Sequence, residues 1–168
     1  MFINGKSLLE ANPIHDMVGE KVRYKGTSYG LSEGGYDIRI AETVHFFRDS
    51  PVLCRVSVAK PNGITQSKPG NFTLASAKES FHMPNNLIGF VKDKSTWARQ
   101  GLSVFNTVIE PGWNGFLTLE LVFHGNDDLT IPAGCGIAQV CFGLLAHDAS
   151  YGNGKYQNQE AGAQGHRS

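Results

Sequence analysis

A short segment near the middle of the chain, residues 94–101, holds the residue types that bind an anion. Lys94 and Arg99 supply positive charge, and Ser95 supplies a hydroxyl group and is a favourable N-cap for a helix of one or two turns. Gly101 is a suitable end for that helix. Because Ser95 and Arg99 share a helix face, the segment indicates a compact anion site at the helix start. A capped surface helix with a solvated arginine is the simpler interpretation of the same residues.

A carboxylate interrupts the most apolar strand that the sequence predicts, residues 116–123. Successive side chains of a strand point to opposite faces, with Leu117, Leu119, Leu121 and Phe123 on one face and Thr118, Glu120 and Val122 on the other. If the second face lines a cleft, Glu120 is a candidate general base; if that face meets water, it is an ordinary surface carboxylate. Glu110 is a second carboxylate in the preceding turn. Trp113 of that turn is open to three interpretations: core, subunit contact or pocket wall.

Catalytic zinc is not expected, because the spacing of its ligands is missing. The zinc deaminase signature requires His-x-Glu followed by Pro-Cys-x-x-Cys, and neither half occurs in the chain. The histidines are therefore interpreted as surface or hydrogen-bonded residues: His15, His45, His82, His124, His147 and His166. The cysteines are interpreted as small buried apolar residues: Cys54, Cys135 and Cys141. A phosphate-binding Walker loop, a dinucleotide fingerprint and a nucleophile elbow are absent as well.

Short apolar runs separated by turn residues indicate an all-β protein. Besides residues 116–123, the predicted strands are 52–58, 71–77, 103–109 and 137–145, and one short helix is predicted at Ser7–Ala11, ended by Asn12 and Pro13. Long helical patterns do not alternate with these strands, so a parallel α/β fold is not expected. The pattern favours a sandwich or barrel.

The length and net charge of the chain limit the kinds of binding partner to be expected. The chain has 168 residues, which suits one domain, and its 15 basic and 15 acidic residues give a net charge of zero. A neutral protein is not expected to bind duplex nucleic acid or an anionic membrane. No apolar run reaches membrane-spanning length, and the first residues do not resemble a signal peptide, so a cytoplasmic protein is expected, in the host cytoplasm if the source is viral.

The last 19 residues, 150–168, contain no Leu, Ile, Val, Phe or Trp. Such a segment cannot pack by itself. It is either a frayed terminus or a lid that orders over a ligand, and Tyr151, Lys155 and Gln159 are side chains suited to touching one.

Taken in order along the chain, several motifs resemble the core of the dCTP deaminases, which are zinc-independent members of the dUTPase-like superfamily. These motifs are residues 35–39 (GYDIR), 72–75 (FTLA), 83–84 (MP), 94–102 (KSTWARQGL), 110–115 (EPGWNG), 119–120 (LE), 136–140 (GIAQV) and 155–159 (KYQNQ). Each motif is short, but the ordered set covers nearly the whole chain.

This resemblance implies a distorted β-barrel or jelly-roll domain over residues 1–149, a flexible C-terminal lid over residues 150–168, and a homotrimer with active sites between subunits. It implies a hydrolase that acts on a cyclic amidine C–N bond and converts dCTP to dUTP and ammonia. Mg²⁺ is expected to arrive with the triphosphate, zinc is not expected, and dTTP is a candidate inhibitor.

The resemblance also assigns roles to residues. The catalytic residues are Glu120, Ser95 and Arg99. Residues implied to contact the nucleotide are Lys94, Ser95, Thr96, Arg99, Glu110, Thr118, Leu119, Glu120, Gln139, Tyr151, Lys155 and Gln159; Thr118 and Leu119 are expected to read the pyrimidine through their backbones. Two positions depart from the family pattern. Lys94 stands where Arg is common, which keeps the charge but not the bidentate fork. Glu110 stands where Asp is common.

Three alternatives remain at this point. A bifunctional enzyme would continue from dUTP to dUMP and diphosphate, although the longer Glu110 side chain weakens that case. A plain dUTPase has no need of the Glu120 carboxylate. A non-catalytic trimeric barrel, used for nucleotide sensing or as a viral structural module, would fit the composition equally well.

Overall fold

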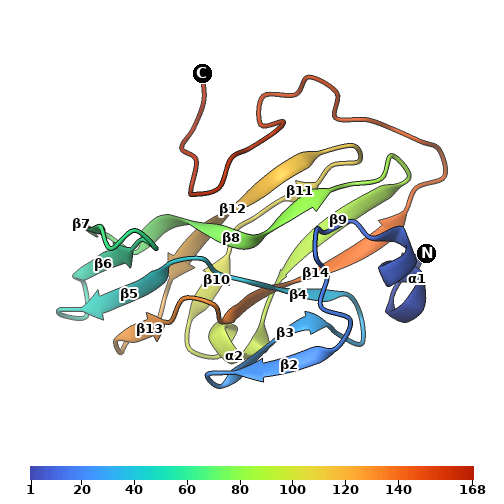
Figure 1. The fold of residues 1–168 in the computed structure, drawn as a ribbon. Helices are drawn as coiled ribbons and strands as arrows, with labels where there is room; N and C mark the ends of the chain where they lie inside the picture. The colour runs from blue at the N-terminus through green and yellow to red at the C-terminus, as the bar shows by residue number, and fades with distance from the viewer.

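The computed structural model describes residues 1–168 and consists of three antiparallel sheets with two short helices (Figure 1). The largest sheet has seven strands in the order β11-β9-β14-β4-β3-β2, with β1 also pairing with β14. Its strands are β1 (Phe2–Ile3), β2 (Lys21–Tyr24), β3 (Thr27–Leu31), β4 (Tyr36–Arg39), β9 (Leu87–Asp93), β11 (Val108–Ile109) and β14 (Gly136–Leu144).

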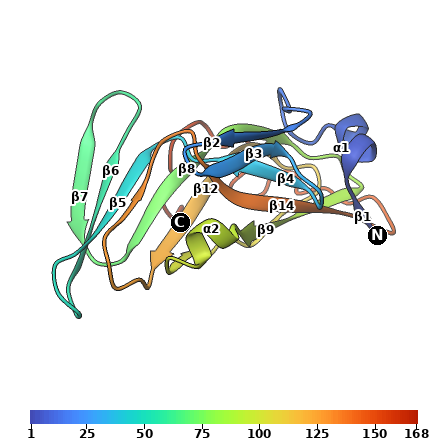
Figure 2. The same cartoon turned by 90° about the horizontal axis from the view of Figure 1, so that it is seen from below.

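Two smaller sheets complete the fold. The three-stranded sheet has the order β10-β12-β8, and the four-stranded sheet the order β13-β5-β6-β7. Their strands are β5 (Thr43–Arg48), β6 (Cys54–Ala59), β7 (Thr65–Pro69), β8 (Phe72–His82), β10 (Leu102–Val104), β12 (Asn114–Phe123) and β13 (Leu129–Ile131). Figure 2 shows the four-stranded sheet at one end of the molecule and the N-terminal helix at the other. The prediction of an all-β protein is confirmed, and neither helix is long and apolar enough to cross a membrane.

Thirty buried apolar residues form one core between the sheets. Phe46 and Phe123 stack with ring centroids 5.0 Å apart and join the four-stranded sheet to the three-stranded one. Burial of such a side chain contributes roughly 1.5–3 kcal/mol. Of the three cysteines, only Cys135 is fully buried, where burial raises the pKa of its thiol. Cys54 and Cys141 are half-buried, so the expectation that all three are core residues is wrong for these two.

Helix α1 (Gly5–Ala11) begins earlier than predicted, because Asn4 rather than Ser7 occupies the N-cap position. Its end matches the prediction. Asn12 adopts a left-handed conformation with φ of 46°, and its N–H group donates to the carbonyl of Leu8. A left-handed residue followed by Pro13 cannot continue a helix.

Helix α2 (Ser95–Ala98) is a single turn, and Lys94 rather than Ser95 is its N-cap residue. The Lys94 backbone is extended, with φ of −84° and ψ of 130°, and its carbonyl accepts the N–H groups of Trp97 and Ala98. Ser95 is therefore the first helical residue and makes no cap bond, which corrects its predicted role. Gly101, at φ of 90°, follows the turn in the left-handed region, where its lack of a side chain is an advantage.

Three predicted strands have clearly different bounds, and the one predicted at 71–77 continues as β8 to His82. The strand predicted at 52–58 begins at Cys54, because Val52 and Leu53 lie exposed in a turn whose N–H groups donate to the Ser50 hydroxyl. The segment predicted as one strand at 103–109 is divided between two sheets. Its first part, β10, pairs with β12, and its last part, β11, pairs with β9. The chain crosses from one sheet to the other at residues 105–107.

Strand β12 follows the predicted alternation over most of its length. Leu119, Leu121 and Phe123 are buried, whereas Thr118, Glu120 and Val122 are only half-buried. Leu117 departs from the pattern, because the register between β12 and β8 shifts between Phe116 and Thr118. The extra residues lie in β8, where three residues, 77–79, stand opposite Leu117 alone, so the regular pairing is interrupted at Leu117. Leu117 consequently lines the same cavity as Thr118 and Glu120.

Candidate active site

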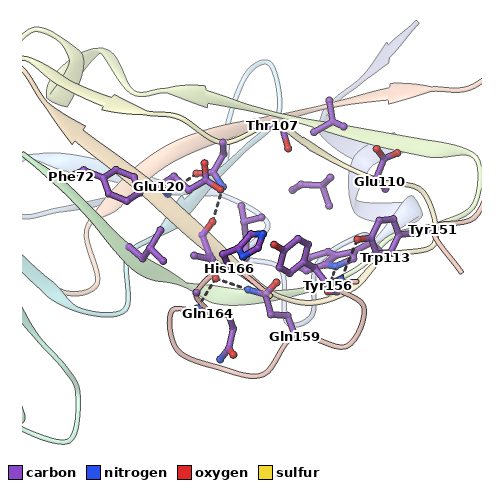
Figure 3. A pocket seen from close by; sticks show the side chains of 17 residues that line it. Phe72, Thr107, Glu110, Trp113, Glu120, Tyr151, Tyr156, Gln159, Gln164 and His166 are labelled. Atoms are coloured by element: carbon purple, nitrogen blue, oxygen red, sulfur yellow. Dashed lines mark hydrogen bonds between the residues drawn. The ribbon is translucent and has the colours of Figure 1, made fainter. Parts of the chain in front are cut away.

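A cavity of about 520 Å³ lies between β12, residues 106–110 and the C-terminal tail (Figure 3). Five residues expected at the nucleotide site line it: Glu110, Thr118, Glu120, Tyr151 and Gln159. Apolar and aromatic side chains, among them those of Phe72, Trp113 and Tyr156, form much of the remaining wall. We refer to this space as the Glu120 cavity.

The Glu120 carboxylate points into this cavity without a protein partner (Figure 3). It forms no ion pair, and the hydrogen bonds of Glu120 all involve its backbone. The second face of β12 therefore lines a cleft, which was the condition for Glu120 to act as a general base. A half-buried carboxylate with both oxygens free is suited to hold and deprotonate a water molecule.

Asn106 braces the strand that carries Glu120, a role that sequence reasoning did not assign. Its Nδ2 donates to the Thr118 carbonyl at 2.6 Å, and its Oδ1 accepts the Glu120 N–H at 3.1 Å. The preceding residue, Phe105, donates its own N–H to the Glu120 carbonyl at 2.8 Å. The carboxamide thus continues the β10–β12 ladder after the β10 backbone has left it. The only signal in the sequence was an amide within the segment predicted as one strand, residues 103–109.

The backbone of Leu119 faces the opposite edge of β12. Backbone groups alternate along an antiparallel strand, so if those of Thr118 and Glu120 face Asn106, those of Leu119 face β8. Leu119 is fully buried and lies opposite Ala75 of β8. Its expected part in reading a pyrimidine stays a prediction, and the backbone groups at the cavity edge belong to Thr118 and Glu120.

The C-terminal tail closes one side of the cavity through hydrogen bonds to two hydroxyl groups. The Gln159 side chain and the Gln164 N–H both donate to Thr118 Oγ1, the latter at 3.0 Å. The Gly162 N–H donates to Ser76 Oγ at 3.2 Å. Although Gln159 belongs to a polar tail, only 6% of it is exposed. The tail therefore packs against the barrel rather than by itself, and its flexibility stays a prediction.

Gly115 permits this close approach. It pairs with Gln159 in an isolated parallel bridge, and the Phe116 N–H donates to the Gln159 carbonyl at 2.8 Å. Gly115 has φ of 135°, and a Cβ atom there would lie 2.5 Å from the Gln159 nitrogen. A side chain at position 115 is thus excluded both by backbone conformation and by the tail.

Trp113 belongs to both the core and the cavity wall. It is 6% exposed, and its ring centroid lies 6.1 Å from that of Phe81 in the core. Its indole N–H donates to the Tyr156 carbonyl of the tail at 2.7 Å. The Tyr156 N–H in turn donates to the Tyr151 hydroxyl at 3.2 Å. Trp113 thereby links the tail to the core.

Four residues of the tail line the cavity and were not predicted as site residues: Tyr156, Gln164, Gly165 and His166. Their position in a segment expected to act as a lid was the available signal. His45 agrees with the prediction of a surface or hydrogen-bonded residue, because its Nδ1 lies 3.2 Å from Thr130 Oγ1. His82 departs from it in part, because its Nδ1 is buried without a hydrogen-bond partner. Glu110 lies toward the other end of the cavity from Glu120 (Figure 3).

A second group of polar residues lies on one face of the seven-stranded sheet, and we call it the Lys94 face. Lys94 Nζ lies 2.5 Å from Asp37 Oδ2 and 3.2 Å from Ser28 Oγ, and Ser28 Oγ donates to the same carboxylate oxygen at 3.0 Å. Gln139 lies opposite Asp37 in the neighbouring strand, and its side chain donates to Ser32 Oγ at 2.7 Å. Asp37 Oδ1 is buried and has no partner.

The remaining predicted residues are exposed on the surface: Ser95, Thr96, Arg99 and Lys155. None of them, nor Lys94 or Gln139, lines the Glu120 cavity. A single chain therefore divides the predicted site into a carboxylate half and a cationic half. No three His, Cys, Asp or Glu side chains come together in a way that could hold a metal ion. The expected independence of zinc stays a prediction.

Comparison with known proteins connects both halves to one family. The model of the dCTP deaminase-like family matches residues 8–145. The dCTP deaminase of Chlamydia muridarum is 36% identical over 165 residues, covering 88% of this chain and 82% of its own. The dCTP deaminase of Roseiflexus castenholzii is 37% identical over 164 residues, covering 89% and 88%.

A solved structure supports the fold. The native EIAV dUTPase superposes with a TM-score of 0.51 at 16% identity and covers 70% of this chain and 81% of its own. At that identity the likeness establishes the dUTPase-like fold alone. The family match, in contrast, spans most of the chain and includes the Lys94 face and the Glu120 side of the cavity, whereas the tail residues of the cavity lie beyond its end at residue 145. The chain belongs to the dCTP deaminase-like family.

Proposed function

We propose that this protein is a hydrolase that converts dCTP to dUTP and ammonia. The observation that carries the proposal is the unpaired Glu120 carboxylate in a cavity lined by apolar, aromatic and polar side chains and by the tail. The dCTP deaminases similar to this chain support the same substrate. A non-catalytic barrel has no use for a half-buried carboxylate without a partner, since such a group is costly to keep.

In the proposed reaction, Glu120 removes a proton from a water molecule as the water oxygen attacks C4 of the cytosine ring. That proton passes to ring nitrogen N3, and C4 becomes tetrahedral. Glu120 then transfers the remaining hydroxyl proton to the amino group. The C4–N4 bond breaks, ammonia leaves and a C4 carbonyl forms. The cavity strengthens these interactions by excluding bulk water.

A homotrimer with sites between subunits explains why one chain holds the two halves apart. Lys94, Ser95, Thr96, Arg99 and Gln139 do not line the Glu120 cavity of their own chain. A neighbouring copy can supply them, with Ser95 and Arg99 orienting the water, the carboxylate and the phosphates. Phe105, an aromatic residue that is 64% exposed beside the cavity loop, is a surface that such a neighbour would cover.

Mg²⁺ is proposed to enter as part of the substrate, bound to the triphosphate. In nucleotide sites, most of the ligands of Mg²⁺ are water molecules and phosphate oxygens, and the protein contributes few carboxylates. We also propose dTTP as an inhibitor, because it offers the same triphosphate and a similar ring without the reacting amino group. A cytoplasmic location remains part of this proposal.

A bifunctional reaction is the second candidate, because Glu110 lines the same cavity as Glu120. A second carboxylate could support attack of water on the phosphate chain of the dUTP product. The products distinguish the two enzymes: dUMP and diphosphate if both reactions occur, and dUTP alone if only deamination does.

The test is incubation of the purified protein with dCTP and Mg²⁺, followed by chromatography of the nucleotides and an ammonia assay. We expect dUTP and ammonia in equal amounts, unchanged turnover with a zinc chelator, and a kcat lower by about 10²–10⁴-fold in Glu120→Gln. Glu10→Gln, an exposed carboxylate of α1, is the matched control and should retain full turnover. A fully active Glu120→Gln enzyme would contradict the mechanism, and a wild-type protein without ammonia release would favour the non-catalytic module.

A further inference from the structure

The β2–β3 hairpin carries a cluster of positive charge that the assigned site does not use. A groove of about 440 Å³ is lined by Lys21, Arg23 and Lys25 of the hairpin together with the hydroxyl-bearing Ser28 and Thr96. The hairpin turn is formed by Lys25 and Gly26, both at positive φ, which is the turn type that suits two antiparallel strands. The three cations are thus presented on a regular, short element.

Two of these cations are uncompensated. Lys21 is paired with Glu33, and this hydrogen bond lowers the pKa of the Glu33 carboxyl. Arg23 and Lys25 have no carboxylate within 4.0 Å. Because the whole chain has a net charge of zero, two free cations in one groove are a local excess of positive charge. They are available to an anion.

The groove is continuous with the Lys94 face. Arg23 lies opposite Ser28 in the hairpin register, so both side chains point to the same face of the sheet. Ser28 Oγ is hydrogen-bonded to both Lys94 and Asp37. The Lys94 charge is neutralised by Asp37, and the Lys94 side chain is only 12% exposed. A triphosphate on this face therefore needs cations in addition to Lys94.

We propose that the β2–β3 hairpin is a second anion-binding element, which holds the outer phosphates of the nucleoside triphosphate through Arg23 and Lys25. The proposal rests on the proposed function for the identity of the nucleotide. The Arg23 guanidinium is suited to a bidentate contact with phosphate, and Lys25 adds a point charge at the turn. The hairpin thereby favours a triphosphate over a monophosphate and contributes to binding rather than to the chemical step.

The direct test is calorimetric binding of inorganic tripolyphosphate to the wild-type protein and to Arg23→Ala/Lys25→Ala. Both side chains are exposed, so the double variant is expected to fold, which a thermal unfolding curve checks. We expect about tenfold weaker binding and a less steep dependence on NaCl concentration. Lys6→Ala/Lys60→Ala removes the same charge from α1 and from the end of β6 and should leave binding unchanged. Equal binding by the wild-type protein and the hairpin variant would overturn the proposal, as would equal loss in both double variants.

A kinetic measurement separates this proposal from the proposed function. With dCTP, the hairpin variant should show a KM raised about tenfold and a kcat within about twofold of wild type. Arg23→Lys keeps the positive charge but not the bidentate geometry of the guanidinium, so its KM should lie between those of the wild-type protein and the hairpin variant. If the wild-type protein releases no ammonia from dCTP, the proposed function fails, while tripolyphosphate binding still decides the role of the hairpin. A fall in kcat at unchanged KM would contradict a binding role.

Discussion

The Glu120 cavity and the Lys94 face differ in whether their charged side chains are paired. In the cavity the carboxylate has no protein partner, and the hydrogen bonds around it are made by backbone, amide and hydroxyl groups. On the Lys94 face the charges already neutralise each other, because the Lys94 ammonium is held by Asp37 and Ser28. The difference indicates that one chain arranges the reacting group in advance, whereas the phosphates must be met by additional cations.

The largest effect, a loss of folding stability, is expected when the buried ion pair between Lys94 and Asp37 is broken. Asp37→Asn leaves the Lys94 ammonium without a counter-charge at a site where the two side chains are only 3% and 12% exposed. Removing one partner of a buried pair costs about 3–5 kcal/mol. Urea unfolding should show this loss of stability. Glu33→Gln breaks the exposed pair with Lys21 and should barely move the midpoint. Similar midpoints for the two variants would show that the Lys94 pair is not a structural element.

A smaller effect, concentrated on activity, is expected from Gly115→Ala. The new Cβ would lie 2.5 Å from the Gln159 nitrogen, so the tail can no longer pack beside β12. If the tail must exclude water from the cavity, turnover of dCTP should fall by about 10–100-fold, which corresponds to roughly 1.4–2.8 kcal/mol. Gly63→Ala is the matched control, since Gly63 also has positive φ but no atoms within 4 Å of a new Cβ. Equal turnover in the two variants would remove the tail from the mechanism.

The bracing role of Asn106 predicts about a tenfold lower kcat for Asn106→Ala. The substitution removes two hydrogen bonds to the backbone on either side of Leu119, and neutral hydrogen bonds contribute about 0.5–1.5 kcal/mol each. Asn71→Ala is the control, because the Asn71 side chain also donates to β12, at the Phe123 carbonyl away from the cavity. Both variants should lose stability, but only Asn106→Ala should lose kcat. The same loss of kcat in both would make the effect one of general strand stability.

The part of this site that was predictable from sequence is the part governed by local pattern. The two-residue period of β12 placed Glu120 on the face opposite the core, and the order of short motifs identified the family. The start of α2 was not predictable, because the Lys94 side chain is held by Asp37, which lies 57 residues earlier in the chain. A cap preference describes one turn of helix and carries no information about such a distant partner.

The contacts of the cavity were unpredictable for the same reason. The bulge beside Leu117 arises from the pairing of β12 with β8, and the bonds of Asn106 depend on the chain crossing between two sheets at residues 105–107. The tail lines the cavity, but its composition predicted no packing partner. Its burial comes from hydroxyl groups on β8 and β12 that satisfy its amides.

The smallest predicted effect is a pH dependence on the cavity side of the molecule. The rings of His15 and His82 lie with centroids 4.0 Å apart and planes tilted by 39°, and His82 lies opposite Asn114, at the start of β12. Burial, followed by the charge of His15, lowers the pKa of His82 below its ordinary value of 6.5. Below pH 6.5 the unfolded chain therefore binds a proton that the folded chain does not. Folding stability should consequently fall as the pH decreases from 6.5 toward the folded pKa, and this contribution should change no further below it.

His82→Gln removes this titration and should flatten the acid side of the stability curve. The measurement is the Tm of both proteins at several values between pH 7.5 and 5, with His147→Gln, an exposed histidine, as the control. The difference in Tm between wild type and His147→Gln should stay nearly constant over this range. The difference between wild type and His82→Gln should shift in favour of the variant as the pH falls. A constant difference for both variants would mean that His82 has the same pKa in the folded and unfolded chains, and the acid sensitivity would then belong to other groups.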